Sequence, residues 1–122
     1  MKYLLILSLF LVSCSPTLQD KIEIKNRFYD TKTKLYVTEA RCFKQGIPSI
    51  FNRSKICIGY LGMPSSSSFA ISWVKNYTAY FPKETKNFII DKLVFNIITL
   101  TPYLIEIELV NDISIPSEYF QK

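Results

Sequence analysis

The feature that most limits the fold of this chain is a series of short apolar runs, each broken by turn-forming residues. The runs cover residues 22–29, 35–43, 56–61, 69–74, 88–100 and 105–109. They are rich in Ile, Val, Phe and Tyr, the residue types that favour β-strands. In the last run, Ile105, Ile107 and Leu109 alternate with Glu106 and Glu108, which is the period of a strand with one buried face.

Six or seven short strands, with no long helix, predict an all-β domain. The simplest architecture is a small antiparallel β-sandwich, and a small β-barrel is the alternative. We expect three hairpins, which pair 22–29 with 35–43, 56–61 with 69–74, and 88–100 with 105–109. The connections are expected at 44–54, which contains Gly46, Pro48 and Asn52, and at the polar stretch 76–87.

Two of these runs need a separate comment, and one of them has a second interpretation. Ile22 and Ile24 alternate with charged residues, which favours a strand, but a helix from Leu18 to Tyr29 is the rival. The run 88–100 is apolar at most positions, so we expect one strand that is buried on both faces and bends near Asp91.

The first residues are expected to lie outside this domain. A positive start, Met1-Lys2, precedes an apolar run from Tyr3 to Val12 that only Ser8 interrupts. This order is typical of an export signal. A membrane-spanning helix needs about 20 apolar residues, roughly twice the length of this run. The segment is therefore interpreted as a signal that is removed.

The next residues, Leu11-Val12-Ser13-Cys14, resemble the lipobox of bacterial lipoproteins, in which signal peptidase II cuts before a lipid-modified cysteine. The resemblance implies a signal peptide at 1–13, a lipidated Cys14 that carries acyl chains such as palmitate, a tether over 14–20 and a single β-rich domain over 21–122. Two or three acyl chains give stable anchoring without a spanning helix.

The same resemblance predicts where the protein is found. A lipid-anchored protein of the bacterial cell envelope is implied, with the membrane bound through Cys14. Ser15 follows the cysteine, where an Asp tends to retain lipoproteins at the inner membrane of Gram-negative bacteria. In a Gram-negative host, Ser15 thus favours the outer membrane, facing the periplasm.

Two cysteines remain for the domain, Cys42 and Cys57. An even count in an exported chain predicts one disulfide, and two unpaired buried thiols are the alternative. The sequence has no His and no C-x-x-C pair, so we expect no metal site and no cofactor.

The positive charge is concentrated in the first half of the domain. Residues 21–55 hold nine Lys or Arg against three acidic residues, whereas residues 56–122 hold five against six. This asymmetry predicts a surface for anionic lipid, lipopolysaccharide or an acidic protein partner in the envelope, and an acidic protein bound through Lys32, Lys34 and Arg41 is the prediction. Ordinary solvation of strand edges is the alternative explanation. Nucleic acid is not expected as a partner of an exported lipoprotein.

Aromatic residues supply a second candidate surface. Trp73, Tyr77, Tyr80 and Phe81 lie close together in the sequence near an expected strand end. Trp73 is assigned to the core, while Tyr77 and Tyr80 are candidates for exposed binding anchors, with core filling as the alternative.

The residue types favour recognition over catalysis. Without His, the Ser-His-Asp and Cys-His mechanisms are excluded, and we predict no catalytic residues. In its signal, size and strand-rich pattern the chain is similar to small periplasmic immunity-type lipoproteins of contact-dependent and type VI secretion systems. That similarity implies a lipid-anchored binding module that recognises a protein partner and neutralises it. A structural or assembly lipoprotein of an envelope secretion machine is the alternative, and an enzyme acting on cell wall or lipid ranks third.

Overall fold

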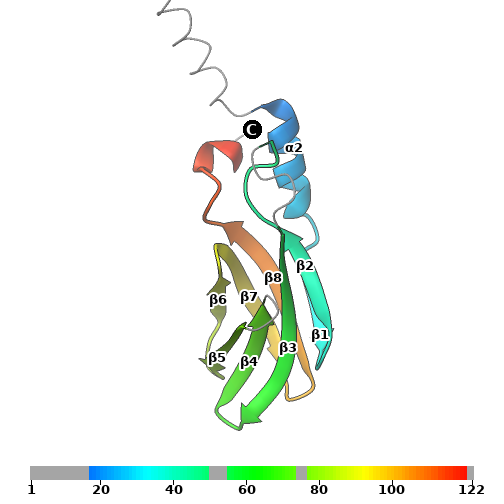
Figure 1. Cartoon of the computed structure of the whole chain (residues 1–122), viewed down its shortest axis with the longest axis vertical. Coiled ribbons are helices and arrows are strands. Elements are labelled where there is room, and N and C mark those ends of the chain that lie inside the picture. Colours follow the sequence, from blue (N-terminus) through cyan, green and yellow to red (C-terminus); the bar gives the residue numbers. More distant parts are fainter. Residues whose placement is uncertain (1–16, 50–54, 74–76, 121–122) are drawn as a thin grey trace, which may run out of the picture.

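The protein is a β-sandwich of two antiparallel four-stranded sheets, with strand orders β1-β8-β7-β6 and β2-β3-β4-β5. The computed structural model describes residues 17–49, 55–73 and 77–120. The strands are β1 (Lys32–Tyr36), β2 (Ala40–Lys44), β3 (Lys55–Ser65), β4 (Ser68–Trp73), β5 (Tyr77–Pro82), β6 (Asn87–Ile90), β7 (Leu93–Leu100) and β8 (Leu104–Asp112). Helix α2 (Leu18–Arg27) and the 3-10 helix η1 (Ser117–Phe120) lie together at one end (Figure 1). The predicted all-β sandwich is confirmed, and the sheets do not close into a barrel.

The two sheets are held together by one apolar core made of alternate residues from facing strands. In β8, Ile105, Ile107 and Leu109 are buried, whereas Glu106 and Glu108 are only partly buried on the opposite face. The largest fully buried core side chains are Tyr60, Phe69 and Phe95. Ring packing of Phe43, Phe69 and Phe88 against their aromatic neighbours fills the space between the sheets.

Two expected hairpins are present, and a third region divides differently. β3 pairs with β4, and β7 pairs with β8, in the predicted antiparallel arrangement. The run 88–100 is two strands, β6 and β7, and not one bent strand. The turn forms at Asp91, whose φ of 56° lies in the left-handed region that Asp tolerates in a tight turn. The polar stretch 76–87 also contains a strand, β5, that we did not predict.

The expected hairpin of 22–29 with 35–43 is wrong. β1 and β2 belong to different sheets, because the chain crosses the sandwich at 37–39. In that crossing, Val37 forms a parallel bridge with Tyr60 of β3. Residues 22–29 pair with neither strand, since most of them belong to helix α2.

Helix α2 forms because Thr17 caps it and its buried positions follow a helical period. The Thr17 side chain accepts a hydrogen bond from the Asp20 N–H at 3.1 Å, which satisfies a free donor of the first turn. Ile24 is fully buried, whereas Ile22 is exposed, so the two residues do not share a face as they would in a strand. Residues 18–20 thus belong to the helix and not to the tether. Within the described residues, no helix is long and apolar enough to cross a membrane.

A small second core fixes α2 to the end of the sandwich. Ile24 packs there with Ile47, Ile115 and Tyr119, and Phe28 contacts both this cluster and the main core. This cluster and the main core share Phe28, so the helix and the sandwich form one packed body over these residues.

Buried polar contacts reinforce the same junction. The carboxylate of Asp112, 1% exposed, accepts hydrogen bonds from the Gly46 N–H at 2.8 Å and from the Ser114 N–H at 2.9 Å. Arg27 donates to the Gly46 carbonyl at 2.7 Å. Burial lowers the pKa of the Arg27 guanidinium, and the carboxylates of Glu23, Asp112 and Asp20 oppose that shift. These groups join the end of α2, the loop at 45–49 and the end of β8.

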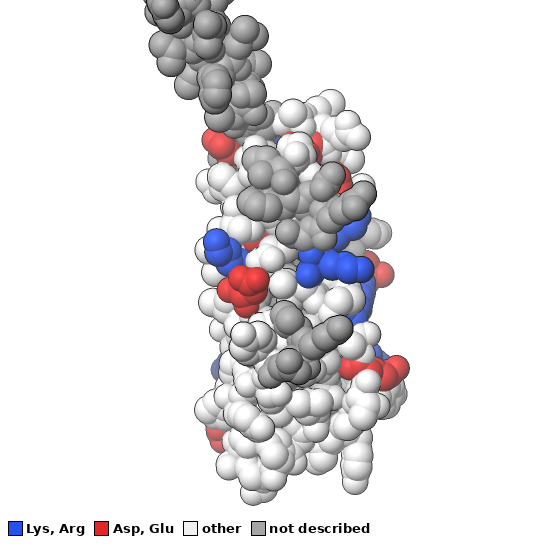
Figure 2. Space-filling view, viewed as in Figure 1, with Lys and Arg blue, Asp and Glu red and all other residues white. Residues whose placement is uncertain are grey.

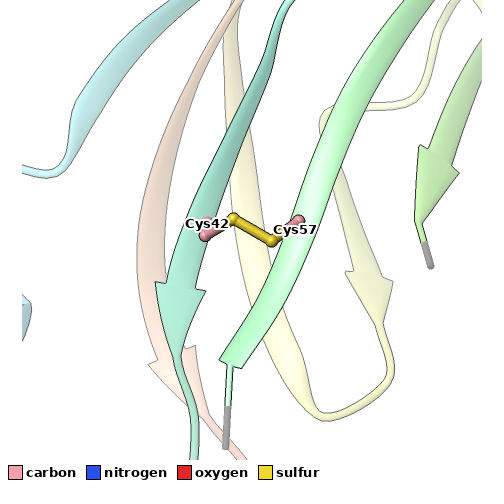
Figure 3. Close-up of a disulfide and its surroundings, with 2 residues drawn as sticks. All are labelled: Cys42 and Cys57. Atoms are coloured by element: carbon pink, nitrogen blue, oxygen red, sulfur yellow. A yellow bond between two sulfur atoms is a disulfide. The ribbon is translucent and has the colours of Figure 1, made fainter. Parts of the chain in front are cut away.

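The two domain cysteines meet on neighbouring strands. Cys42 of β2 lies directly opposite Cys57 of β3, and the two sulfur atoms are at disulfide-bonding distance (Figure 3). The next register pair, Phe43 and Ile56, is buried in the core. Because side chains alternate between the two faces of a sheet, the cysteine pair lies on the outer face. The pairing predicted from the cysteine count is therefore present.

We predict that changing Cys42 and Cys57 together to Ser lowers the free energy of unfolding by about 3 kcal/mol, because a closed loop of about 15 residues is released in the unfolded chain. Denaturant unfolding of the oxidised protein and of the double variant measures the difference. Wild-type protein unfolded under reducing conditions is the matched control and should behave like the variant. A midpoint that the double substitution does not move would contradict the prediction.

A second prediction concerns Tyr60, whose hydroxyl donates to the Thr101 carbonyl at 2.5 Å. Burial raises the pKa of this phenol above its ordinary value of about 10. The unfolded chain ionises first, so stability from Tyr60 is complete below about pH 10 and falls as the pH rises through the higher folded pKa. We expect Tyr60→Phe to cost about 1 kcal/mol at neutral pH, through the lost hydrogen bond.

The dependence of stability on pH separates the effect of the lost hydrogen bond from the effect of the raised pKa of Tyr60. The difference in unfolding free energy between wild type and Tyr60→Phe should shrink above about pH 10, because the variant has no phenol to ionise. Exposed Tyr103 provides the control, and Tyr103→Phe should leave the profile unchanged. A wild-type profile that stays parallel to that of Tyr60→Phe up to pH 11 or so would refute this account.

Candidate functional site

The candidate site is the free edge of β5, which differs from the other three sheet edges. β1 carries Lys32 and Lys34 at its edge, β2 carries Arg41 and Lys44, and β6 is only four residues long. Charged residues and short length are the usual protection of an edge strand against pairing with another chain. β5 spans six residues, Tyr77–Pro82, and none of them is charged. Its outer edge pairs with no strand among the described residues.

The backbone of β5 presents hydrogen-bonding groups along this edge. The Lys83 N–H donates to the Ser67 carbonyl at 2.9 Å, just beyond the register pair of Ser68 and Pro82. This bond makes Ser68 and Pro82 a non-hydrogen-bonded pair of the antiparallel ladder. Hydrogen-bonded and non-hydrogen-bonded pairs alternate along a ladder, so Thr78 and Tyr80 also belong to non-hydrogen-bonded pairs. The N–H and C=O groups of Thr78 and Tyr80 thus point away from β4. They form a template for a further antiparallel or parallel strand.

Two tyrosines flank this edge on opposite faces of the sheet. Tyr77 is 61% exposed and stacks on Trp73, with ring centroids 5.7 Å apart. Tyr80 is 67% exposed and lies opposite Ala70 in the register, on the outer face. Trp73 and Phe81 pack against the core, as predicted for Trp73. The sequence therefore places two large exposed rings beside free backbone groups.

The strand β5 is itself neutral, and exposed Lys83, Glu84 and Lys86 follow directly after it. Figure 2 shows that the charged side chains on this face lie mostly at mid-height, and that the part over β3 and β4 carries few of them. The β3–β4 turn is built from Ser65 to Ser68, where the Ser65 hydroxyl bonds to those of Ser67 and Ser68. A partner at the β5 edge would meet a neutral, aromatic strand with charged residues of both signs just beyond Pro82.

The basic residues that we singled out lie elsewhere. In β1, Lys32 and Lys34 are exposed, and each lies directly opposite a glutamate of β8, Glu108 and Glu106. Opposite charges in such cross-strand positions attract, so the two glutamates offset the local positive charge.

Arg41 has a different environment. It faces the gap between the sheets at the β2 edge, where its guanidinium donates to the Thr33 hydroxyl and lies 5.2 Å from the Phe43 ring. β2 and β5 are the two opposite edges of one sheet. The structure thus brings Arg41 near β1, but it does not bring the basic residues together with Tyr77 and Tyr80.

Other groups have a structural role or fall outside the described part. Cys14, the predicted lipidation site, lies outside it. Across residues 17–49, 55–73 and 77–120, no group of three His, Cys, Asp or Glu side chains is placed to hold a metal ion. The buried carboxylates of Asp20 and Asp112 are engaged by Ser49, Gly46 and Ser114.

The sequence contained a signal for this edge that we did not use. Tyr77 to Phe81 includes aromatic residues and a Thr, which favour a strand, and Pro82 is allowed only where no ladder donor is needed. The flanking Asn, Lys and Glu residues led us to interpret the whole stretch as a polar connection.

Comparisons with protein-family models, with curated proteins and with solved structures found no match to this chain.

Proposed function

We propose that this chain is a lipid-anchored binding module of the bacterial cell envelope that recognises a protein partner and, as an immunity-type protein, neutralises it. The β5 edge carries this proposal. It combines free backbone donors and acceptors with two exposed tyrosines. The proposed mode of binding is strand addition, in which the partner supplies a segment that pairs with β5.

Strand addition divides affinity and specificity between different groups. Main-chain hydrogen bonds to the outward groups of Thr78 and Tyr80 supply an affinity that does not depend on the partner's side chains. The rings of Tyr77 and Tyr80 lie on the two faces of the added strand and select its side chains. Aromatic anchors of this type often dominate the energy of an interface.

The anchoring part of the proposal is supported by the N-terminal sequence. A cysteine at position 14, after a short apolar run, has the arrangement of a lipoprotein signal. Anchoring keeps the domain close to a membrane, where a partner that arrives in the envelope is met before it reaches its target. In a Gram-negative host we place the anchor at the outer membrane, facing the periplasm.

The test of the binding mode is a pair of substitutions at Thr78. Thr78→Pro removes the outward N–H of β5 and leaves the ladder to β4 intact, so the domain should fold while partner binding falls by about tenfold or more. Thr78→Val keeps the N–H and is the matched control. Affinity is measured on the partner captured from envelope extracts and from extracts of neighbouring cells.

The aromatic contribution is measured on the same complex. Tyr77→Ala and Tyr80→Ala should each speed dissociation by about tenfold and leave association nearly unchanged, because buried anchors act on the dissociation rate. Full affinity in Thr78→Pro together with unaltered dissociation in both Tyr variants would place the interface elsewhere. Substitution of Lys32 and Lys34 by Ser then tests whether an acidic part of the partner also interacts with the β1 edge, through slower association at low salt.

For the anchor, we predict that Cys14→Ser abolishes palmitate incorporation and membrane fractionation of the processed protein. The domain should still fold, because the main core and the smaller cluster around Ile24 are built from side chains at positions 24–119. Ser15→Ala keeps Leu11 to Cys14 intact and should incorporate label as the wild type does. Incorporation of label into the Cys14→Ser protein would show that the lipid is attached to another residue.

A further inference from the structure

The end of the sandwich that carries α2 has an exposed apolar surface. An apolar groove of about 500 Å³ runs between α2 and η1. Its lining consists of Leu18, Ile22, Phe28, Tyr29, Tyr119 and Phe120, together with Lys21 and Lys25. Several of these side chains are strongly exposed, with Leu18 at 74%, Ile22 at 52% and Tyr29 at 83%. Exposed apolar surface of this kind is typical of a site that binds a protein, a ligand or a membrane.

The charges of α2 are divided between its two sides. Glu23 pairs with Lys44 of β2 at 3.7 Å, and Asp20 accepts a hydrogen bond from Ser49 at 2.8 Å, so both acids face the sandwich. Lys21 and Lys25 line the groove, and no acidic residue in the described part of the chain does. The exposed side of the helix is thus apolar with a cationic border, which is the composition of a helix that lies in a membrane interface.

The position of the helix in the chain limits what can cover it. The N-cap of α2 is Thr17, three residues after Cys14. Three fully extended residues reach about 11 Å at most. If Cys14 carries a membrane lipid, the N-cap of α2 cannot lie farther than this from the bilayer surface.

We propose that the exposed side of α2, with Phe120 of η1, docks onto the surface of an anionic lipid bilayer. The inference rests on the lipid anchoring proposed for Cys14. Leu18, Ile22 and Tyr29 enter the boundary between headgroups and acyl chains, and Lys21 and Lys25 contact the anionic headgroups. Docking fixes the orientation of the sandwich, so its far end points away from the membrane. The β7–β8 connection lies at this far end (Figure 1).

The test uses the full chain in vesicles of phosphatidylethanolamine and phosphatidylglycerol. Trp73 is the single tryptophan, so Trp73→Phe provides a silent background. In this background Tyr29→Trp reports from the groove, and Tyr103→Trp reports from the β7–β8 connection. Tyr103 is 76% exposed, similar to Tyr29, and is therefore a matched control.

Two quenchers are applied, brominated lipid from the bilayer and acrylamide from water. We expect brominated lipid to quench Tyr29→Trp at least about twofold more than Tyr103→Trp, and acrylamide to show the reverse order. Equal lipid quenching of the two probes would overturn the proposal. Protection of Tyr29→Trp from both quenchers would also overturn it, since a protein, such as a second copy of this chain, would then cover the groove.

Charge reversal tests the headgroup contact. Lys21→Glu with Lys25→Glu should reduce the lipid quenching of Tyr29→Trp in anionic vesicles. Lys83→Glu with Lys86→Glu, in the connection after β5, changes the net charge equally and should have no effect. Equal effects of the two pairs would show that only net charge matters, which contradicts a docked helix face.

The fate of the anchor is measured separately by mass spectrometry of the N-terminal peptide. If Cys14 carries lipid and Tyr29→Trp is not quenched by brominated lipid, the docking fails and the anchoring stands. If Cys14 carries no lipid and Tyr29→Trp is still quenched, the anchoring fails and the docking stands. If Cys14 carries no lipid and Tyr29→Trp is not quenched by brominated lipid, both the anchoring and the docking are rejected.

Discussion

Burial of alternate side chains from β3, β4, β7 and β8 between two sheets is the interaction on which the other features depend. It places Ile58, Ile71, Phe95 and Ile107 in one shared core. Filling that core requires strand pairing in a fixed register, since a shift by one residue would turn each apolar side chain to solvent. The same packing leaves two parts of the molecule without a natural cover: the sheet edges and the ends. One edge is neutral and aromatic, and one end is capped by a short helix.

Prediction from the sequence succeeded where alternation and burial coincide. The β7–β8 hairpin follows directly from the pattern of Ile105 to Leu109, and β3–β4 from two apolar runs around a serine-rich turn. In α2 the prediction failed because Ile22 and Ile24 have the spacing of a strand, while the deciding signal was the cap formed by Thr17 and Asp20. That signal lay in a stretch interpreted as a tether.

The candidate site was predictable only in part. Tyr77 and Tyr80 were chosen from residue type. Their role as binding residues depends on β5 being an edge strand, and the order of strands in the sheet could not be predicted from the sequence. For Lys32 and Lys34 the sequence indicated positive charge and gave no sign of Glu108 and Glu106 across the ladder. The charge of a surface depends on partners that are distant in the chain, so counts along the sequence overestimated it.

The link between Cys42 and Cys57 has a further consequence for how the chain finds its fold. It joins directly opposed residues of β2 and β3, so an oxidised chain retains only those alignments of the two strands that lie close to the native one. β3 in turn serves as the template for β4, and β4 for β5. One covalent bond at one edge of the sheet thereby narrows the search for every later strand, including the strand whose other edge stays open.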